Sequence, residues 1–172
     1  MANWNQISEE ARAKGSTFDI IRKTALADLN KYTKRNTILY YSGWLQKNAQ
    51  ELQQALSIND MDMNGFMTAV NGLDPDADLD LILHTPGGEV AATEAIISYL
   101  QSKFKHIRVI VPQLAMSGGT MIACSANQII MGKHSSLGPV DPQIGGIPAH
   151  GIVEEFDKAH KEIRQDSSRL AV

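Results

Sequence analysis

The feature that most constrains the fold is a regular alternation of short apolar runs with amphipathic, helix-like segments. The apolar runs predict strands, and the segments between them predict helices, over these residues: strands 37–42, 79–84, 107–112 and 128–131; helices 18–36, 60–73, 89–104, 117–126 and 152–164. Strands that alternate with helices over short connections are typical of a parallel sheet covered by helices. We therefore expect an α/β fold with a mainly parallel sheet, preceded by an N-terminal helix.

Two of the predicted strand-to-helix turns each carry a pair of glycines: Thr85-Pro86-Gly87-Gly88 and Met116-Ser117-Gly118-Gly119. Gly87 and Ser117 stand 30 residues apart, which is one helix plus one strand. Because such a unit places successive parallel strands side by side, we expect the two turns to be neighbours.

Backbone amides at the start of a helix lack an intrahelical partner and suit an oxyanion. Ser117 stands where a nucleophile is needed, so the Gly88 and Gly118 amides are expected to flank its hydroxyl. Two simpler interpretations remain: Ser117 caps the helix, and the first turn is only a tight turn.

Composition excludes several function classes. A net charge of −3 without a basic patch argues against a nucleic-acid binder, and one cysteine excludes a disulfide framework or a multi-cysteine metal site. That residue, Cys124, is interpreted as a small buried side chain. The charge-free stretch 109–132 is broken by polar residues, so it predicts protein interior and not a membrane span. With no signal peptide in view, we expect a soluble, cytoplasmic protein.

The sequence offers little sign of a cofactor or metal site. There is no G-x-G-x-x-G after a strand and no sign of a pyridoxal site, so we expect no cofactor. The segment Asp60-x-Asp62-x-Asn64-Gly65 resembles the start of a calcium loop, but Asn71 stands where the loop needs a bidentate Glu. We expect a helix capped by Asn59 or Asp60 there, and no metal.

The combination of motifs resembles the ClpP/crotonase superfamily. The closest resemblance is to the serine dehydrogenase proteinase family of ClpP-like proteins, and signal peptide peptidase A and NfeD-type proteases are more distant relatives. The resemblance to the serine dehydrogenase proteinase family rests on the two glycine turns and on three further segments: Tyr40-Tyr41-Ser42-Gly43, Ile58-Asn59-Asp60 and Ser136-Leu137-Gly138-Pro139-Val140-Asp141-Pro142-Gln143. The resemblance covers roughly residues 36–165.

This resemblance implies a fold of repeated ββα units, with residues 1–36 as a helical extension and 37–172 as the peptidase domain. It implies Ser117 as nucleophile and Gly88 and Gly118 as the oxyanion hole. Proteins of this family usually continue further, so two alternatives stay open: the domain is truncated at its C-terminus, or it is a short member of the family.

The general base is harder to assign. ClpP itself uses Ser-His-Asp, but the position matching its histidine falls on Val140 or Asp141. The Ser-Lys relatives point instead to Lys158, with Lys161 one turn later. The alternatives are that both lysines lie on a solvated helix face and that His134, His150 or a residue beyond Val172 supplies the base.

The expected function is that of a ClpP-like serine peptidase acting on peptides or unfolded proteins. By resemblance its substrate groove is bordered by four residues: Gly87, Gly145, Gly146 and Ile147. The superfamily also implies a homo-oligomer. Two alternatives stay open, namely a crotonase-type enzyme acting on a thioester and a non-catalytic scaffold that has kept the fold.

Overall fold

The computed structural model describes residues 9, 18–46, 53–141, 143–144 and 147–166. Its contacts divide the chain into two units, Met1–Gly138 and Pro139–Val172, and each is described here by itself. Among the described residues, no helix has the length and apolar character needed to cross a bilayer.

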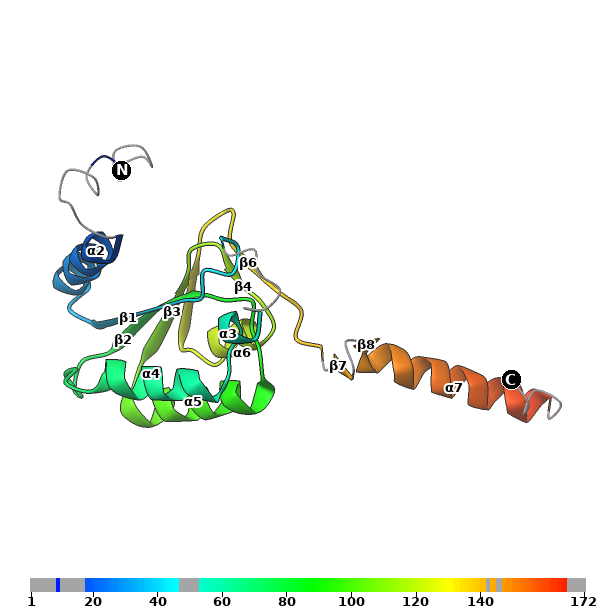
Figure 1. Cartoon of the computed structure of the whole chain (residues 1–172). Helices are drawn as coiled ribbons and strands as arrows, with labels where there is room; N and C mark the ends of the chain where they lie inside the picture. Colours follow the sequence, from blue (N-terminus) through cyan, green and yellow to red (C-terminus); the bar gives the residue numbers. More distant parts are fainter. Residues whose placement is uncertain (1–8, 10–17, 47–52, 142, 145–146, 167–172) are drawn as a thin grey trace. The chain divides into compact units, whose positions relative to one another are not determined.

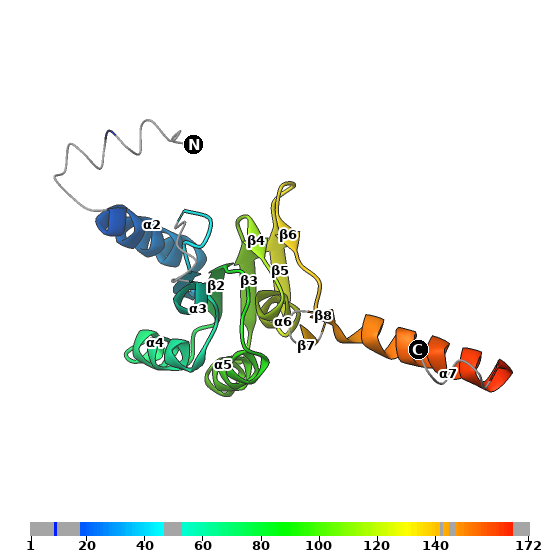
Figure 2. The ribbon, with the colours of Figure 1, turned by 45° about the vertical axis from the view of Figure 1, so that its right-hand side comes forward.

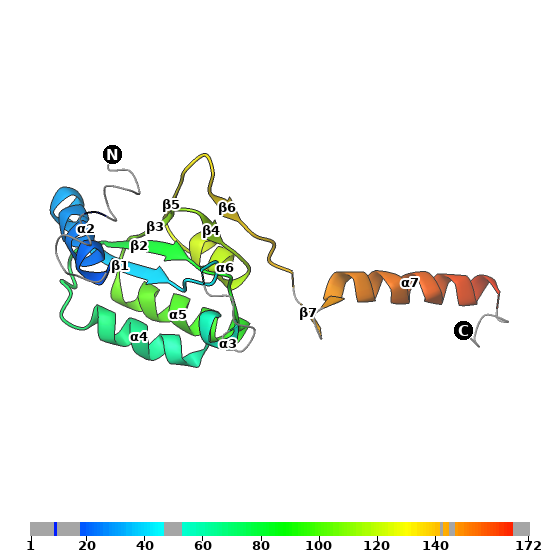
Figure 3. The same ribbon diagram turned by 45° about the horizontal axis from the view of Figure 1, so that its top comes forward.

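The first unit is built on a four-stranded sheet in which all neighbouring strands are parallel. Its strands follow one another across the sheet (Figure 3; β2, β3 and β5 are also labelled in Figure 2): β1 (Asn36–Tyr41), β2 (Leu79–His84), β3 (Ile107–Val111) and β5 (Gln128–Met131). The sequence-based prediction of an α/β fold with a mainly parallel sheet is confirmed.

Helices cover one face of this sheet, where α4 and α5 lie along it (Figures 1 and 3). The helices of this unit are α2 (Phe18–Thr33), α3 (Gln53–Leu56), α4 (Asp60–Val70), α5 (Val90–Lys103) and α6 (Gly118–Cys124). Alternate strand residues, such as Leu81 and Val109, are fully buried in one core with Ile96 of α5. Burial alternates along β3, whereas β2 is buried at five of its six residues because it lies inside the sheet between β1 and β3.

Helix α4 begins with a capping box. The Asn59 side chain accepts a hydrogen bond from the Met61 amide at 2.9 Å, and the Asp62 carboxylate accepts one from the Asn59 amide at 2.9 Å. These contacts satisfy two amides that a helix start leaves open. The prediction of a helix cap in this segment is confirmed.

A short parallel pair, β4 (Leu114–Ala115) with β6 (Ser136–Leu137), extends the unit beyond β3. The sequence analysis did not predict these two-residue strands, nor α3, because elements this short leave no periodic pattern.

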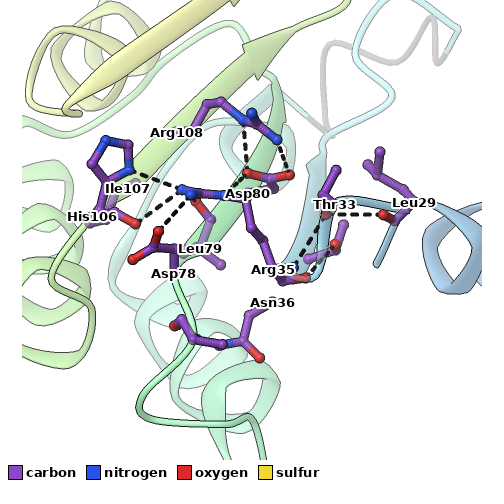
Figure 4. Close-up of polar contacts among 12 residues, drawn as sticks. Leu29, Thr33, Arg35, Asn36, Asp78, Leu79, Asp80, His106, Ile107 and Arg108 are labelled. Atoms are coloured by element: carbon purple, nitrogen blue, oxygen red, sulfur yellow. Dashed lines mark hydrogen bonds and ion pairs between the residues drawn. The ribbon is translucent and has the colours of Figure 1, made fainter. Parts of the chain in front are cut away.

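At the amino end of the sheet, a buried carboxylate is held by two arginines (Figure 4). Asp80 is fully buried and accepts hydrogen bonds from Arg35 at 2.6 Å and from Arg108 at 2.9 and 2.6 Å. Arg35 also pairs with Asp78 at 2.7 Å and contacts the His106 ring at 3.0 Å. This network ties the start of β1 to β2 and β3.

Two expectations of burial are wrong. Cys124 is exposed, since it lies in the last turn of α6. All four residues of β5 are exposed too, including Ile129 and Ile130 at 37% and 38%, because β5 is the edge strand of the described sheet. The stretch 109–132 is therefore interior only in part.

The second unit consists of a short antiparallel pair and one long helix. The pair is β7 (Gln143–Ile144) with β8 (Ile147–Pro148), and the helix is α7 (Ala149–Gln165). The helix begins three residues before the predicted Ile152. It buries no residue, and Val153 and Phe156 are 56% and 76% exposed.

Candidate active site

The two glycine turns lie side by side at the carboxyl end of β2. The Thr85 amide donates to the Leu114 carbonyl at 3.1 Å, and the Met116 amide donates to the Thr85 carbonyl at 3.0 Å. This bridge between Thr85 and Ala115 continues the parallel pairing past the ends of the main strands. The 30-residue spacing thus brings the turns together, as predicted.

Gly87 fills the point of closest approach between the turns. Its φ is +90°, and a Cβ added there would lie 2.7 Å from Ser117 Cβ and 2.8 Å from the Gly118 amide nitrogen. Any side chain at this position would therefore overlap the second turn. Three more glycines are closely packed in the same way. An added Cβ would clash with Ile58 at Gly88, with Thr93 at Gly118 and with Thr85 at Gly119.

Ser117 adopts a backbone conformation that residues with side chains rarely take. Its φ is 47° and its ψ is −116°, and such left-handed geometry stores on the order of 1–3 kcal/mol of strain. The side chain makes no capping hydrogen bond and is exposed. The helix-cap interpretation of Ser117 is therefore wrong: the residue stands at the cap position, but its hydroxyl makes no hydrogen bond to the start of the helix.

A serine on a strained turn between a strand and a helix is the arrangement known as a nucleophile elbow. In that arrangement the sharp turn exposes the hydroxyl beside the amide of the following residue. Here the following residue is Gly118. The G-x-S-x-G motif is absent, since Ala115 replaces its first glycine, yet the turn has the same character.

The Gly88 amide is directed away from its strand-like neighbour. Ile58 donates to the Gly87 carbonyl at 2.8 Å and accepts from the Glu89 amide at 2.9 Å, which is the pattern of a parallel bridge centred on Gly88. In such a bridge, the central residue's own N–H points to the opposite side. Among the described residues, no acceptor pairs with this amide.

The Gly118 amide is likewise open, because it is the first in α6 and precedes the helical hydrogen-bond ladder. The neighbouring Gly119 amide does bond, to the Met116 carbonyl at 2.8 Å. Two free amides thus flank the Ser117 turn within the described part of the chain, one from each glycine pair.

A polar network that sequence reasoning missed holds the first turn in place. The fully buried Thr85 hydroxyl accepts from the Gly87 amide at 3.1 Å. The Tyr40 hydroxyl lies near the side chains of Thr85 and Asp62, and burial together with the Asp62 charge raises the Tyr40 pKa well above its ordinary value. The network runs from the α4 cap through β1 to the turn.

His84, which ends β2, joins the two turns from a second side. Its Nδ1 accepts from the Leu114 amide at 3.3 Å, as expected for a structural histidine bonded to backbone. Its ring stacks on Tyr41 at 5.1 Å and on Trp44 at 6.2 Å between centroids. Burial lowers the His84 pKa from 6.5, so the ring is held neutral with its proton on Nε2.

The candidate bases occupy different places. Lys158 and Lys161 are exposed on α7 of the second unit, where His150 lies 3.2 Å from Glu154. His134 is exposed in the turn after β5. Lys158 lies in the second unit and Ser117 in the first, so the assignment of Lys158 as the general base stays a prediction.

The expected groove residues divide in the same way. Gly87 lies in the first unit against Ser117. Gly145 and Gly146 lie outside the described residues, and Ile147 belongs to β8, where it pairs with Ile144. Over the described residues, no group of three His, Cys, Asp or Glu side chains is arranged to hold a metal ion.

A strained serine beside two open amides, on a parallel α/β sheet, is an arrangement suited to acyl transfer. Comparison with known families agrees with the sequence: the model of the ClpP-like SDH-type serine proteinases matches residues 51–171, more than half of the chain. The chain belongs to this family, and the resemblance inferred from its motifs is confirmed.

Three curated proteins of Methanocaldococcus jannaschii are similar to this chain. Two are uncharacterized proteins, 42% identical over 109 residues and 40% identical over 106 residues, covering 63% and 62% of this chain. A third, named only provisionally as a protease, is 30% identical over 78 residues, or 44% of this chain and 25% of its own length. The chain spans 38% and 36% of the lengths of the first two relatives.

Proposed function

We propose that this chain carries the catalytic serine of a peptidase that cleaves peptide bonds through a covalent acyl-enzyme. Ser117 Oγ attacks the substrate carbonyl carbon, and the carbonyl oxygen takes up negative charge between the Gly88 and Gly118 amides. Collapse of this intermediate breaks the C–N bond and releases the amine. Water then hydrolyses the Ser117 ester and regenerates the serine.

One observation carries this proposal: the backbone conformation of Ser117. The strained backbone of Ser117, at φ 47°, is not compensated by a helix cap, since its side chain makes no capping hydrogen bond. Residues held in such conformations cluster at active sites, where they aim a side chain at a substrate. The exposure of Ser117 is consistent with that role.

The two free amides supply the second requirement of acyl transfer. A donor of this kind contributes about 3 to 4 kcal/mol of transition-state stabilisation in a serine peptidase. Glycine is needed at 87, 88 and 118, because an added Cβ would meet atoms of Ser117, Ile58 and Thr93 respectively. The glycines thus allow the close packing of the two turns that the proposed oxyanion hole requires.

Lys158 is the proposed general base. It would take the Ser117 proton during attack and pass it to the leaving amine, as in Ser-Lys peptidases. This role requires α7 to bring the amine within about 3 Å of Ser117 Oγ. Gly87, Gly145, Gly146 and Ile147 are proposed to border the groove in which an extended peptide or unfolded protein lies.

Hydrolysis of an unfolded protein such as casein tests the proposal. Ser117→Ala should abolish the activity, and Lys158→Ala should lower it by at least about a hundredfold. Lys161→Ala, one turn along the same helix, is the matched control and should retain most activity. Casein cleavage that persists in Ser117→Ala would contradict the proposal.

We also propose that the protein self-associates. The support is α7, which has apolar Val153 and Phe156 exposed and buries none of its described residues. An amphipathic helix of this kind is stable when its apolar face packs against another surface. Light scattering should report a mass above 18.8 kDa at micromolar concentration, and a monomer would contradict it.

A further inference from the structure

A cavity of about 700 Å³ adjoins the turn that carries the Gly88 amide. It is lined by residues before and within the start of α4 and by the first turn itself: Ala55, Ser57, Ile58, Asn59, Met61, Gly88 and Glu89. Gly88 forms part of its wall, and the adjacent Gly87 lies against Ser117. The cavity therefore adjoins the turn that carries one of the two proposed oxyanion donors.

The wall of the cavity is fixed where it meets the turn. Ile58 is fully buried and bonds on both sides of Gly88, to the Gly87 carbonyl and the Glu89 amide. Asn59 is held by the capping box of α4. Met61, by contrast, is 79% exposed, so its flexible thioether forms an adaptable apolar rim. A rigid floor with an adaptable rim suits a long, unbranched side chain.

Glu89 is the one ionisable residue among the described residues that line the cavity. It stands at the N-cap position of α5, yet its side chain makes no capping hydrogen bond. Among the described residues, no cation pairs with its exposed carboxylate. Nearby Asp60, exposed at the first position of α4, adds a second negative charge close to the rim.

We propose that this cavity is a specificity site for a basic side chain, lysine or arginine, of the peptide substrate. The aliphatic stem would lie along the exposed side chains of Ala55 and Met61, and the cationic head would face Glu89. Lysine and arginine side chains combine a stem and a head of this kind. The inference rests on the proposed function, because it assigns the substrate class of the Ser117 site.

The test compares two peptidyl diphenyl phosphonates that react with the nucleophilic serine. They are identical except for the side chain beside the phosphorus, which is lysine in one and norleucine in the other. Norleucine keeps the stem and removes the charge. For the native chain, the lysine probe should label Ser117 about 1.5- to fivefold faster, the range expected for a partly exposed ion pair.

Variants identify the residue responsible. Glu89→Gln should bring the ratio of the two rates close to one, and Glu89→Lys should bring it below one. Glu94→Gln is the matched control, since Glu94 is exposed on the same helix but does not line the cavity. It should leave the ratio unchanged. An equal effect of Glu94→Gln would indicate a general field and overturn the inference.

A small fluorophosphonate without a peptide separates the two proposals. If it labels Ser117 while the lysine and norleucine probes react equally, the specificity site is wrong and the hydrolase proposal stands. A faster norleucine probe would overturn the basic preference in the same way, in favour of an apolar one. If no probe labels Ser117 in folded protein, the proposed function fails and the specificity site fails with it.

Discussion

Gly87 and Ser117 are in such close contact that a Cβ on Gly87 would lie 2.7 Å from the Cβ of Ser117. The two residues come from different strand-to-helix turns, so this contact fixes the distance between the two halves of the site. It places one glycine pair beside the other, and with it one free amide beside the other. The chemistry proposed for Ser117 depends on this contact.

Replacing Gly87 with alanine should therefore disrupt the site. The new methyl group would overlap the second turn. The backbone φ of +90° at position 87 also strains any residue other than glycine. We expect a loss of more than about 1 kcal/mol in the free energy of unfolding and at least a tenfold slower reaction of Ser117 with a fluorophosphonate. Urea unfolding and labelling kinetics measure the two effects.

Gly65→Ala is the control for that variant. Gly65 lies within α4, where an added Cβ meets nothing within 4 Å. Alanine there should raise the free energy of unfolding by about 0.5–1 kcal/mol and leave labelling unchanged. A Gly87→Ala protein as stable and as reactive as the native chain would contradict the proposed geometry.

Thr85→Val should weaken the same turn without changing its shape. Valine removes the hydroxyl that accepts from the Gly87 amide and lies near the Tyr40 hydroxyl. The buried groups left unpaired should lower the free energy of unfolding by about 1–3 kcal/mol, and labelling should slow. Thr68→Val on the exposed face of α4, where the hydroxyl bonds Asn64 at 2.8 Å, should change stability by less than about 0.5 kcal/mol. Equal effects of the two variants would refute a special role for Thr85.

Asp80 should be among the most sensitive positions for stability. Asp80→Ala would remove the fully buried carboxylate that pairs Arg35 and Arg108, and would leave two guanidinium groups without it. We expect a loss of about 3–5 kcal/mol in the free energy of unfolding, measured by urea denaturation. The exposed Asp76→Ala should cost less than about 0.5 kcal/mol. A small effect at Asp80 would show that the arginines find other partners.

The sequence predicted the parts of the site that one local pattern encodes. Gly88 and Ser117 could be placed together because one helix and one strand separate them. In a parallel sheet, such a unit brings the carboxyl ends of two successive strands side by side. The strain at Ser117 could not be predicted, since a serine before two glycines fits an ordinary helix cap equally well.

Contacts among elements that are distant in the sequence could not be predicted for a different reason. Tyr40, Asp62 and Thr85 come from β1, α4 and the end of β2, and no spacing relates them. The exposure of Ile130 was missed because an apolar run indicates a strand but not whether that strand lies at an edge. A threonine directly before Pro-Gly-Gly was the one available signal, because its hydroxyl can bond the amide two residues on.

Stability should depend on pH through His84. Burial lowers its pKa below the ordinary 6.5, so the unfolded chain takes up a proton first as the pH falls. Proton uptake by the unfolded chain favours unfolding, and the contribution of the neutral ring is complete above pH 6.5 and lost as the pH falls toward the lowered value.

The measurement is the urea midpoint between about pH 7.5 and pH 5 for the native chain and His84→Asn. Asparagine keeps an acceptor for the Leu114 amide but does not titrate. The native chain should lose stability more steeply toward low pH, by at most about 1.4 kcal/mol per pH unit. Parallel curves for the two proteins would mean that His84 is not held neutral by the fold.

The central claim is that Ser117 is an activated nucleophile, and covalent labelling tests it most directly. The folded chain and Ser117→Ala are treated with a fluorophosphonate, and adducts are counted by intact mass and located by peptide mapping. We predict one adduct per native chain, on Ser117, with none in Ser117→Ala and none in urea-unfolded protein. A native chain that stays unlabelled, or a Ser117→Ala variant that is labelled equally, would contradict the claim.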